Sequence, residues 1–174
     1  MYCLIAAEAA IFTIFVVAYI FYIGKSLSGP QPKDVLHAPI FYSICLLSSS
    51  LTIHIAVSKL AVANIAAFAR WWLLTILLGG TFLYGTAREW VHLIFNEGLT
   101  VSTNLFGTTY YALVGLHAFH VTMGLLALIT VALFYVTSRL RHDHAERLEV
   151  LSMYWHFVDA VWIVVFTVVY VIGV

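Results

Sequence analysis

Five long apolar segments divide this sequence, and short polar stretches separate them. A helix needs about 20 apolar residues to cross the hydrocarbon core of a bilayer. Each segment reaches about that length, and the five cover residues 2–23, 38–57, 70–92, 107–137 and 149–172. The pattern therefore predicts an all-α integral membrane bundle of five transmembrane helices, forming a single domain over residues 1–174.

Composition supports the same prediction. Hydrophobic residues make up 63% of the 174 residues and charged residues only 9%, whereas a soluble domain carries about 25% charged residues. The mean hydropathy is +1.01. A soluble enzyme, a disordered chain and a nucleic-acid-binding protein are excluded, the last also because the net charge is zero.

The basic residues predict an orientation. The second and fourth connections hold five of them: Lys59, Arg70, Arg139, Arg141 and Arg147. The first and third hold Lys25 and Lys33, with Arg88 as a third if it reaches the surface. Because cytoplasmic loops carry the excess of Lys and Arg, we expect the N-terminus in the cytoplasm and the C-terminus outside.

Small residues recur inside the predicted helices. They are Ser48, Ser49 and Ser50 in the second helix, Gly79 and Gly80 in the third, and Gly115 and Gly124 in the fourth. Small side chains let membrane helices approach closely, so we interpret these positions as packing notches.

Glu8 is an ionisable residue in the first apolar segment, with no basic residue within a helical turn. Such residues are costly in hydrocarbon and usually face the protein interior or a cavity. Glu8 either handles protons or contacts a lipid headgroup, or it is a neutral acid bonded to a neighbouring helix. The residue pattern favours neither interpretation.

Three polar pairs lie one helical turn apart: His117 with His120, Glu89 with His92, and His156 with Asp159. Glu-x-x-His occurs in di-iron bundles, and histidines on two helices can ligate a haem. Only one Glu-x-x-His is present, however, and histidines bonded across helices are the commoner case in membranes. An intramembrane metal or haem site is therefore an alternative to a structural role.

Several motifs resemble subunit III of the haem-copper oxidases. They are Tyr154–Trp162 (YWHFVDAVW), Gly115–Val121 (GLHAFHV) followed by Gly124, the residues Leu78, Gly79, Phe82, Glu89 and Trp90, the triplet Leu47–Ser49, and Glu8. They follow the family's order over nearly the whole chain, which is similar to the short five-helix bacterial form of cytochrome c oxidase subunit III, without the first two helices of the long form. Ala118 and Thr86 depart from the residues most common in the family.

The resemblance implies a non-catalytic core subunit of a proton-pumping terminal oxidase that reduces dioxygen to water. Its partners would be oxidase subunits I and II and phospholipids, and a larger respiratory supercomplex would be a further candidate partner. The haem and copper would lie in the partner subunits, with no cofactor and no active site on this chain. Its location would be the bacterial inner membrane.

The resemblance also implies roles for named residues. A region for lipid or proton uptake would include Glu8, His117 and His120. A structural polar-aromatic cluster would comprise Trp155, His156, Asp159 and Trp162. Near the outer surface, Glu89 would pair with Arg88 or His92. None of these residues is expected to be catalytic or to bind metal.

Four alternatives stay open. The oxidase could use quinol instead of cytochrome c, or the chain could be an accessory subunit of a nitric-oxide reductase. From other classes come a stand-alone intramembrane haem or metal protein and a small transporter or lipid-binding protein. The absence of an inverted repeat in the sequence counts against the transporter.

Overall fold

The computed structural model describes residues 2–25, 36, 38–137 and 145–173. Lys33, Arg139 and Arg141, on which part of the predicted orientation depends, lie outside these residues. The orientation stays a prediction.

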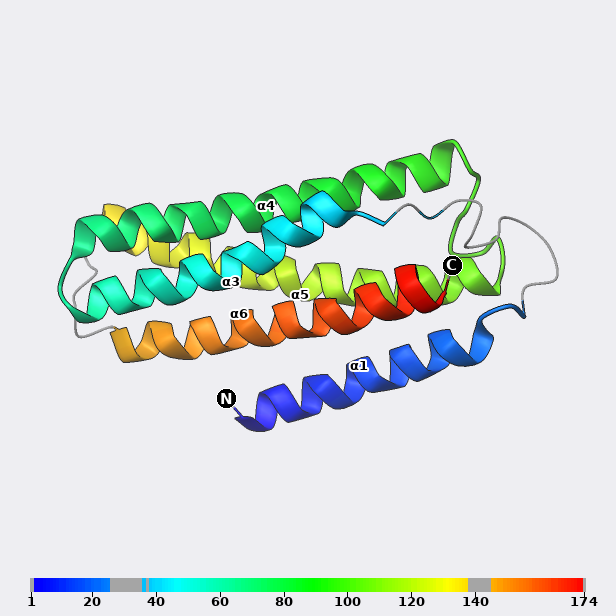
Figure 1. Ribbon diagram of the computed structural model, residues 1–174, viewed down its shortest axis with the longest axis horizontal. Coiled ribbons are helices and arrows are strands. Elements are labelled where there is room, and N and C mark those ends of the chain that lie inside the picture. Colours follow the sequence, from blue (N-terminus) through cyan, green and yellow to red (C-terminus); the bar gives the residue numbers. More distant parts are fainter. Residues whose placement is uncertain (1, 26–35, 37, 138–144, 174) are drawn as a thin grey trace. The chain divides into compact units, whose positions relative to one another are not determined.

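The described residues form helices and contain no strand. The helices are α1 (Tyr2–Tyr22), α3 (Ile40–Ala61), α4 (Ile65–Phe95), α5 (Leu105–Val136) and α6 (Ala145–Phe166), and α6 continues as a π-helix, η2 (Thr167–Ile172) (Figure 1). Among the described residues, five helical segments are long and apolar enough to cross a membrane. The predicted all-α class with five transmembrane helices is confirmed.

The helix predicted over residues 70–92 is longer at both ends, running from Ile65 to Phe95 as α4. Asn64 explains the early start, because its Oδ1 accepts a hydrogen bond from the Ala67 N–H at 3.1 Å and so caps the helix. Just before it, Ala63 has a φ of 56°, which ends the preceding helix. Asn104 caps α5 in the same way, accepting from the Gly107 N–H at 2.8 Å.

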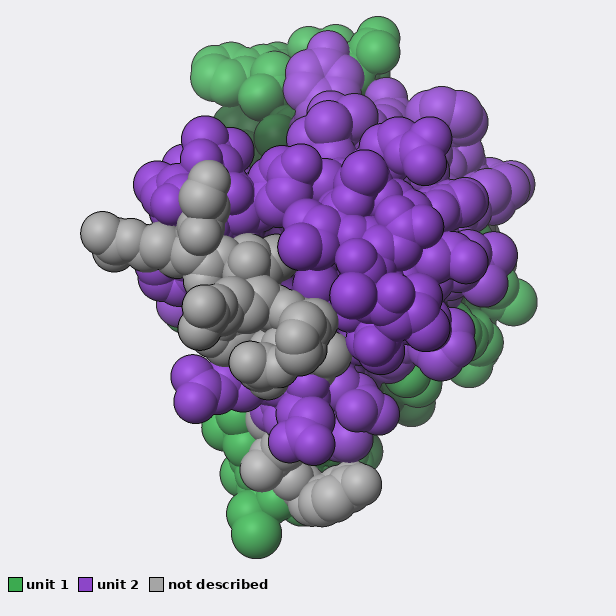
Figure 2. Space-filling view, turned by 90° about the vertical axis from the view of Figure 1, so that its left-hand side faces the viewer, with its two compact units in different colours: residues 1–39, 85–119, 160–174 green, residues 40–84, 120–159 purple. Residues whose placement is uncertain are grey.

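The chain divides into two compact units, coloured separately in Figure 2. Unit 1 comprises residues 1–39, 85–119 and 160–174, and unit 2 comprises residues 40–84 and 120–159. Helices α4, α5 and α6 each contribute residues to both units.

Unit 2 is held by apolar packing and by hydrogen bonds between helices. The Trp72 indole N–H donates to the Leu128 carbonyl at 2.9 Å. The hydroxyls of Thr52 and Thr75 lie 2.7 Å apart and join α3 to α4. Because these polar groups satisfy each other, they can be buried among apolar side chains.

Unit 1 has an aromatic core. Among the described side chains of α1, only Phe12 and Tyr19 are buried. Tyr19 meets Phe106 of α5 edge-on at 6.4 Å between ring centroids, and Phe106 packs against Tyr110 at 5.8 Å. Within unit 1, α1 thus packs against α5 through a few large aromatic rings.

Candidate functional site

A buried carboxyl group, that of Asp159, lies in the polar part of unit 2. The Ser50 hydroxyl of α3 donates to Asp159 Oδ2 at 2.5 Å, and it lies 2.8 Å from Nδ1 of His156. The other ring nitrogen of His156 is 3.2 Å from the Ser152 hydroxyl. Ser152, His156 and Asp159 are spaced by four and three residues, which places them on one face of α6. That face is fastened to α3 through Ser50.

The order of these groups differs from that of a hydrolase triad. In a triad, the imidazole lies between the serine and the aspartate and passes protons between them. Here the hydroxyl of Ser50 lies between His156 and Asp159. The arrangement therefore fits helix pairing rather than activation of a nucleophile.

Trp155 is hydrogen-bonded to Ser49, the residue before Ser50 on α3. Its indole N–H donates to the Ser49 hydroxyl at 2.8 Å, and its side chain is fully buried. Two glycines make room for the ring: a Cβ atom would lie 3.0 Å from it at Gly79 and 2.8 Å from it at Gly124. These two glycines act as the packing notches that the sequence predicted.

Of the predicted polar-aromatic cluster, Trp155, His156 and Asp159 lie in unit 2, and each is engaged with a serine of α3 or α6. Sequence reasoning had treated Ser49 and Ser50 as small residues for packing. The signal available was their place in a run of serines inside an apolar helix. Nothing in the sequence linked that run to α6.

Trp162, the fourth member of that predicted cluster, lies in unit 1. There it stacks on the ring of His117, with 4.8 Å between the ring centroids and 29° between the planes. Phe12 of α1 meets the same imidazole edge-on at 6.4 Å. His117 is fully buried in this aromatic group.

His120, the predicted companion of His117, belongs to unit 2 and is buried there. Its backbone carbonyl accepts a hydrogen bond from the Tyr154 hydroxyl at 3.3 Å. The two histidines thus have different packing partners, although they lie one turn apart on α5.

Glu89 of α4 lies in unit 1 and is half-buried. Its Oε1 accepts hydrogen bonds from the hydroxyls of Tyr170 at 2.8 Å and Tyr110 at 3.2 Å. The side chains of Arg88 and His92, its predicted partners, are exposed. Sequence reasoning missed both tyrosines, because they come from other helices and no local spacing connects them to Glu89.

Glu8 is half-buried on α1, beside a groove of about 190 Å³ between α1 and α6. The groove is lined by Ala9, Phe12, Thr13, Val16, Val161 and Val164. Thr13 is the one lining residue with a polar side chain, and its hydroxyl donates to the Ala9 carbonyl at 2.8 Å. The remaining walls are apolar, so the groove suits a hydrocarbon chain.

Within the described part of the chain, no three His, Cys, Asp or Glu side chains come together as a set that could hold a metal ion. The rings of His54 and His156 lie 6.5 Å apart between centroids. Cys3 and Cys45 are free thiols. The side chains of Ser50, Trp155 and Glu89 make hydrogen bonds to other helices, which is the geometry of helix-fastening contacts.

Comparison with known proteins identifies the family of this chain. The family model described as Cytochrome c oxidase subunit III matches residues 4–174. Cytochrome c oxidase subunit 3 of Alkalihalophilus pseudofirmus is 33% identical over 172 residues, covering 98% of this chain and 84% of the relative. The protein of the same name from Corynebacterium diphtheriae is 39% identical over 149 residues, covering 86% and 72%. A probable quinol oxidase subunit 3 of Staphylococcus saprophyticus is 30% identical over 172 residues, covering 97% and 85%.

Proposed function

The chain belongs to the cytochrome c oxidase subunit III family and is subunit III of a haem-copper oxidase, and we propose that it serves there as a non-catalytic core subunit. It is an integral membrane protein that works within an oxidase complex with other subunits. The complex reduces dioxygen to water, pumps protons and takes electrons from cytochrome c. Haem and copper are held by the partner subunits I and II, in the inner membrane of a bacterium.

The role of the chain is to stabilise the catalytic subunit. The observation that carries this proposal is the engagement of His156, Asp159 and Trp155 with the α3 serines. These are the most distinctive polar residues of the family-like motif, and hydrogen bonds between helices already occupy them. Such bonds hold helices in a defined arrangement, which a partner subunit can pack against.

Phospholipid binding and support of proton uptake are the second part of the role. The apolar groove, which is lined from Ala9 onward, supports a site for a lipid chain. In this proposal the polar end of that lipid lies toward Glu8, the residue before Ala9. For His117, the stacking on Trp162 favours the role of an anchor between helices over contact with a headgroup.

The test is a pull-down of tagged chain in mild detergent, followed by visible difference spectra of the complex and of the separated chain. We expect haem absorbance in the complex and none on the chain after its partners are removed. Haem or stoichiometric iron that stays on the separated chain would overturn the proposal. It would favour the stand-alone metal or haem protein, with the histidines as candidate ligands.

A quinol oxidase is the second candidate complex, favoured by the similarity to the Staphylococcus saprophyticus protein. The two candidates differ in the electron donor that the purified complex oxidises. We expect oxygen uptake with reduced cytochrome c and none with a quinol analogue. Uptake with the quinol analogue alone would assign the chain to the quinol type.

A further inference from the structure

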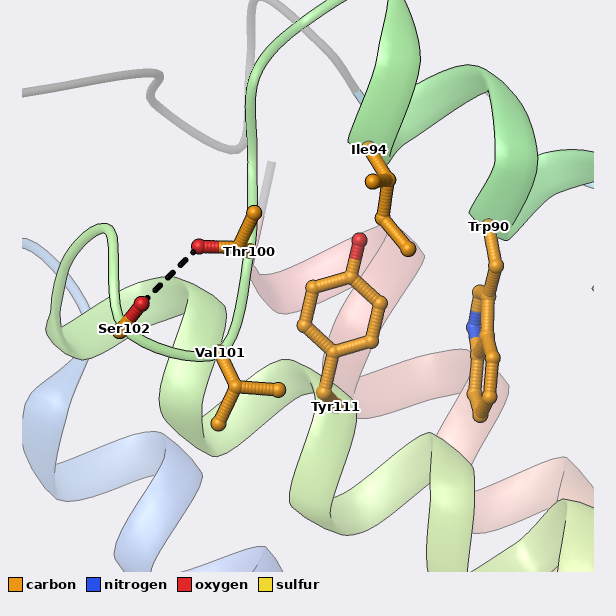
Figure 3. Close-up of a pocket in the computed structure, with 6 residues that line it drawn as sticks. All are labelled: Trp90, Ile94, Thr100, Val101, Ser102 and Tyr111. Carbon is orange, nitrogen blue, oxygen red and sulfur yellow. Dashed lines mark hydrogen bonds between the residues drawn. The ribbon is translucent and has the colours of Figure 1, made fainter.

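A second cavity, of about 450 Å³, lies in unit 1 where α4 ends and α5 begins (Figure 3). Its lining residues are Trp90, Ile94, Thr100, Val101, Ser102 and Tyr111. Pockets for small ligands commonly measure about 300–1,000 Å³, so this one is large enough for a ligand. It shares no lining residue with the groove beside Glu8.

The loop that forms one wall is held by its own hydrogen bonds. The Tyr111 hydroxyl donates to the Leu99 carbonyl at 2.8 Å. The Thr100 N–H donates to the Thr103 hydroxyl at 2.9 Å, and the Thr108 hydroxyl donates to the Val101 carbonyl at 2.6 Å. The cavity is therefore preformed, as ligand sites usually are.

A close backbone approach reinforces this loop. At Gly107, in the first turn of α5, a Cβ atom would lie only 2.4 Å from the Thr100 carbonyl oxygen. The loop could not take this path with a larger residue at that position. Across the cavity, the Trp90 ring lies over Gly115, where a Cβ atom would be 3.4 Å away, and meets Tyr111 edge-on at 5.5 Å.

The lining has two chemical parts. Trp90, Ile94 and Tyr111 come from the ends of membrane-spanning helices, and they supply apolar and aromatic surface. Thr100 and Ser102 come from the loop outside both spans, and their hydroxyls lie 3.3 Å apart (Figure 3). None of the six lining residues is charged. The cavity surface is thus mostly apolar, with the two hydroxyl-bearing residues on its loop side at the end of the span, where Trp and Tyr meet the membrane interface.

We propose that this cavity binds one acyl chain of a phospholipid. The chain lies against Trp90, Ile94 and Val101, and the neutral ester region lies at the Ser102 hydroxyl. The Thr100 hydroxyl is held 2.7 Å from that of Thr103, which donates to the Gly98 carbonyl, so Ser102 is the donor for an ester carbonyl. Because none of the described residues that line the cavity is a Lys or Arg, we expect binding not to depend on the charge of the headgroup. This inference rests on the proposed lipid binding of the subunit and adds a second, separate place for it.

A matched pair of substitutions tests the site in the purified oxidase complex. Val101→Trp fills the cavity. Val91→Trp makes the same change at an α4 position outside the cavity lining that is exposed to nearly the same degree, 56% against 58% for Val101. After controlled delipidation, bound phospholipid is counted per complex by mass spectrometry. We expect the Val101→Trp complex to lose one phospholipid that the wild type and Val91→Trp retain, and equal counts in all three would overturn the site.

Two further measurements sharpen the test. In complexes exchanged into phosphatidylethanolamine or phosphatidylglycerol alone, we expect equal retention, and retention of only one would overturn the independence from headgroup charge. With p-benzoylphenylalanine in place of Val101, illumination should give an adduct of lipid mass. An adduct to a polypeptide would instead identify this surface as a protein contact and overturn the proposal. The haem spectrum and subunit content of each preparation report separately on the proposed function.

Discussion

Two carboxyl groups, Asp159 in unit 2 and Glu89 in unit 1, lie within the membrane-spanning helices and are stabilised in different ways. Asp159 accepts from one serine hydroxyl, which also contacts an imidazole. Glu89 accepts from two phenols, and no imidazole belongs to the set formed by Glu89, Tyr110 and Tyr170. Both receive donors from other helices, as the cost of burying polar groups requires.

The difference lies in how far each network extends. Around Asp159, hydrogen bonds continue along α6 through His156 to Ser152, and the adjacent Trp155 is bonded to α3 as well. Around Glu89, the hydroxyls of Tyr110 and Tyr170 donate to Oε1 and lie 3.4 Å from each other. We expect a substitution at Asp159 to have the larger effect, because the Asp159 side chain is buried and that of Glu89 is only half-buried. The following experiments test that ranking, from the largest expected effect to the smallest.

Asp159→Ala should have the largest effect. It removes the acceptor of the Ser50 hydroxyl in a buried network, which costs about 2–3 kcal/mol of stability. Asp159→Asn keeps a carbonyl acceptor for the Ser50 hydroxyl and should retain most of that stability. The measurement is the fraction of complex that keeps this chain during detergent and heat challenge. The assembled fraction should keep its haem, and loss of haem from fully assembled Asp159→Ala complex would contradict a structural role.

Gly124→Ala should come next. The new Cβ would lie 2.8 Å from the Trp155 ring, so the ring must shift and its bond to Ser49 weakens, at a cost of about 1–2 kcal/mol. Gly80→Ala is the matched control, because nothing lies within 4 Å of a Cβ there. The midpoint of thermal unfolding should fall for Gly124→Ala and stay or rise for Gly80→Ala. Equal midpoints for the two variants would show that Trp155 packing does not limit stability.

Tyr170→Phe and Tyr110→Phe address the Glu89 group. The bond from Tyr170 is shorter, 2.8 Å against 3.2 Å, so we expect a loss of about 1 kcal/mol for Tyr170→Phe and about half of that for Tyr110→Phe. Unfolding by graded detergent denaturation, followed by circular dichroism, measures both. A larger loss here than in Asp159→Ala would reverse the ranking of the two carboxyl groups.

The Thr52 and Thr75 hydroxyl pair provides the baseline, because it joins two helices without a carboxyl group. A double-mutant cycle with Thr52→Val and Thr75→Val should give a coupling energy of about 0.6 kcal/mol, the average for such bonds in membranes. Additive effects of the two substitutions would mean that the hydrogen bond between the two hydroxyls contributes no stability. Another hydrogen-bonded pair would then be needed as the baseline for the carboxyl networks.

Much of the fold was predictable, because the requirement that defines it is local. A segment either has enough apolar residues to cross the bilayer or it does not, and five segments do. The predicted helix ends were less accurate, because α4 begins at Ile65 rather than near Arg70. The cap at Asn64 acts through a single side chain, which the average hydrophobicity of a segment does not detect. The family was also predictable, and the match over residues 4–174 confirms it.

The candidate site was predictable only along single helices. The spacing of His156 and Asp159 placed them on one face of α6, and the shared contact with Ser50 agrees with that. Their partner was not predictable, because Ser50 is 109 residues from Asp159 in the sequence. The same holds for Glu89, whose tyrosine partners lie 21 and 81 residues away.

By itself, the sequence determined that this protein lies in a membrane, that it crosses with five helices, and which family it belongs to. These properties depend on composition and order along the chain, and a helix satisfies its backbone within each segment. Only the tertiary structure decided which helix supplies the partner of each buried polar group. The reason is physical: a carboxyl in a low-dielectric interior accepts any suitably placed hydroxyl, and packing alone selects between Ser50, Tyr110 and Tyr170.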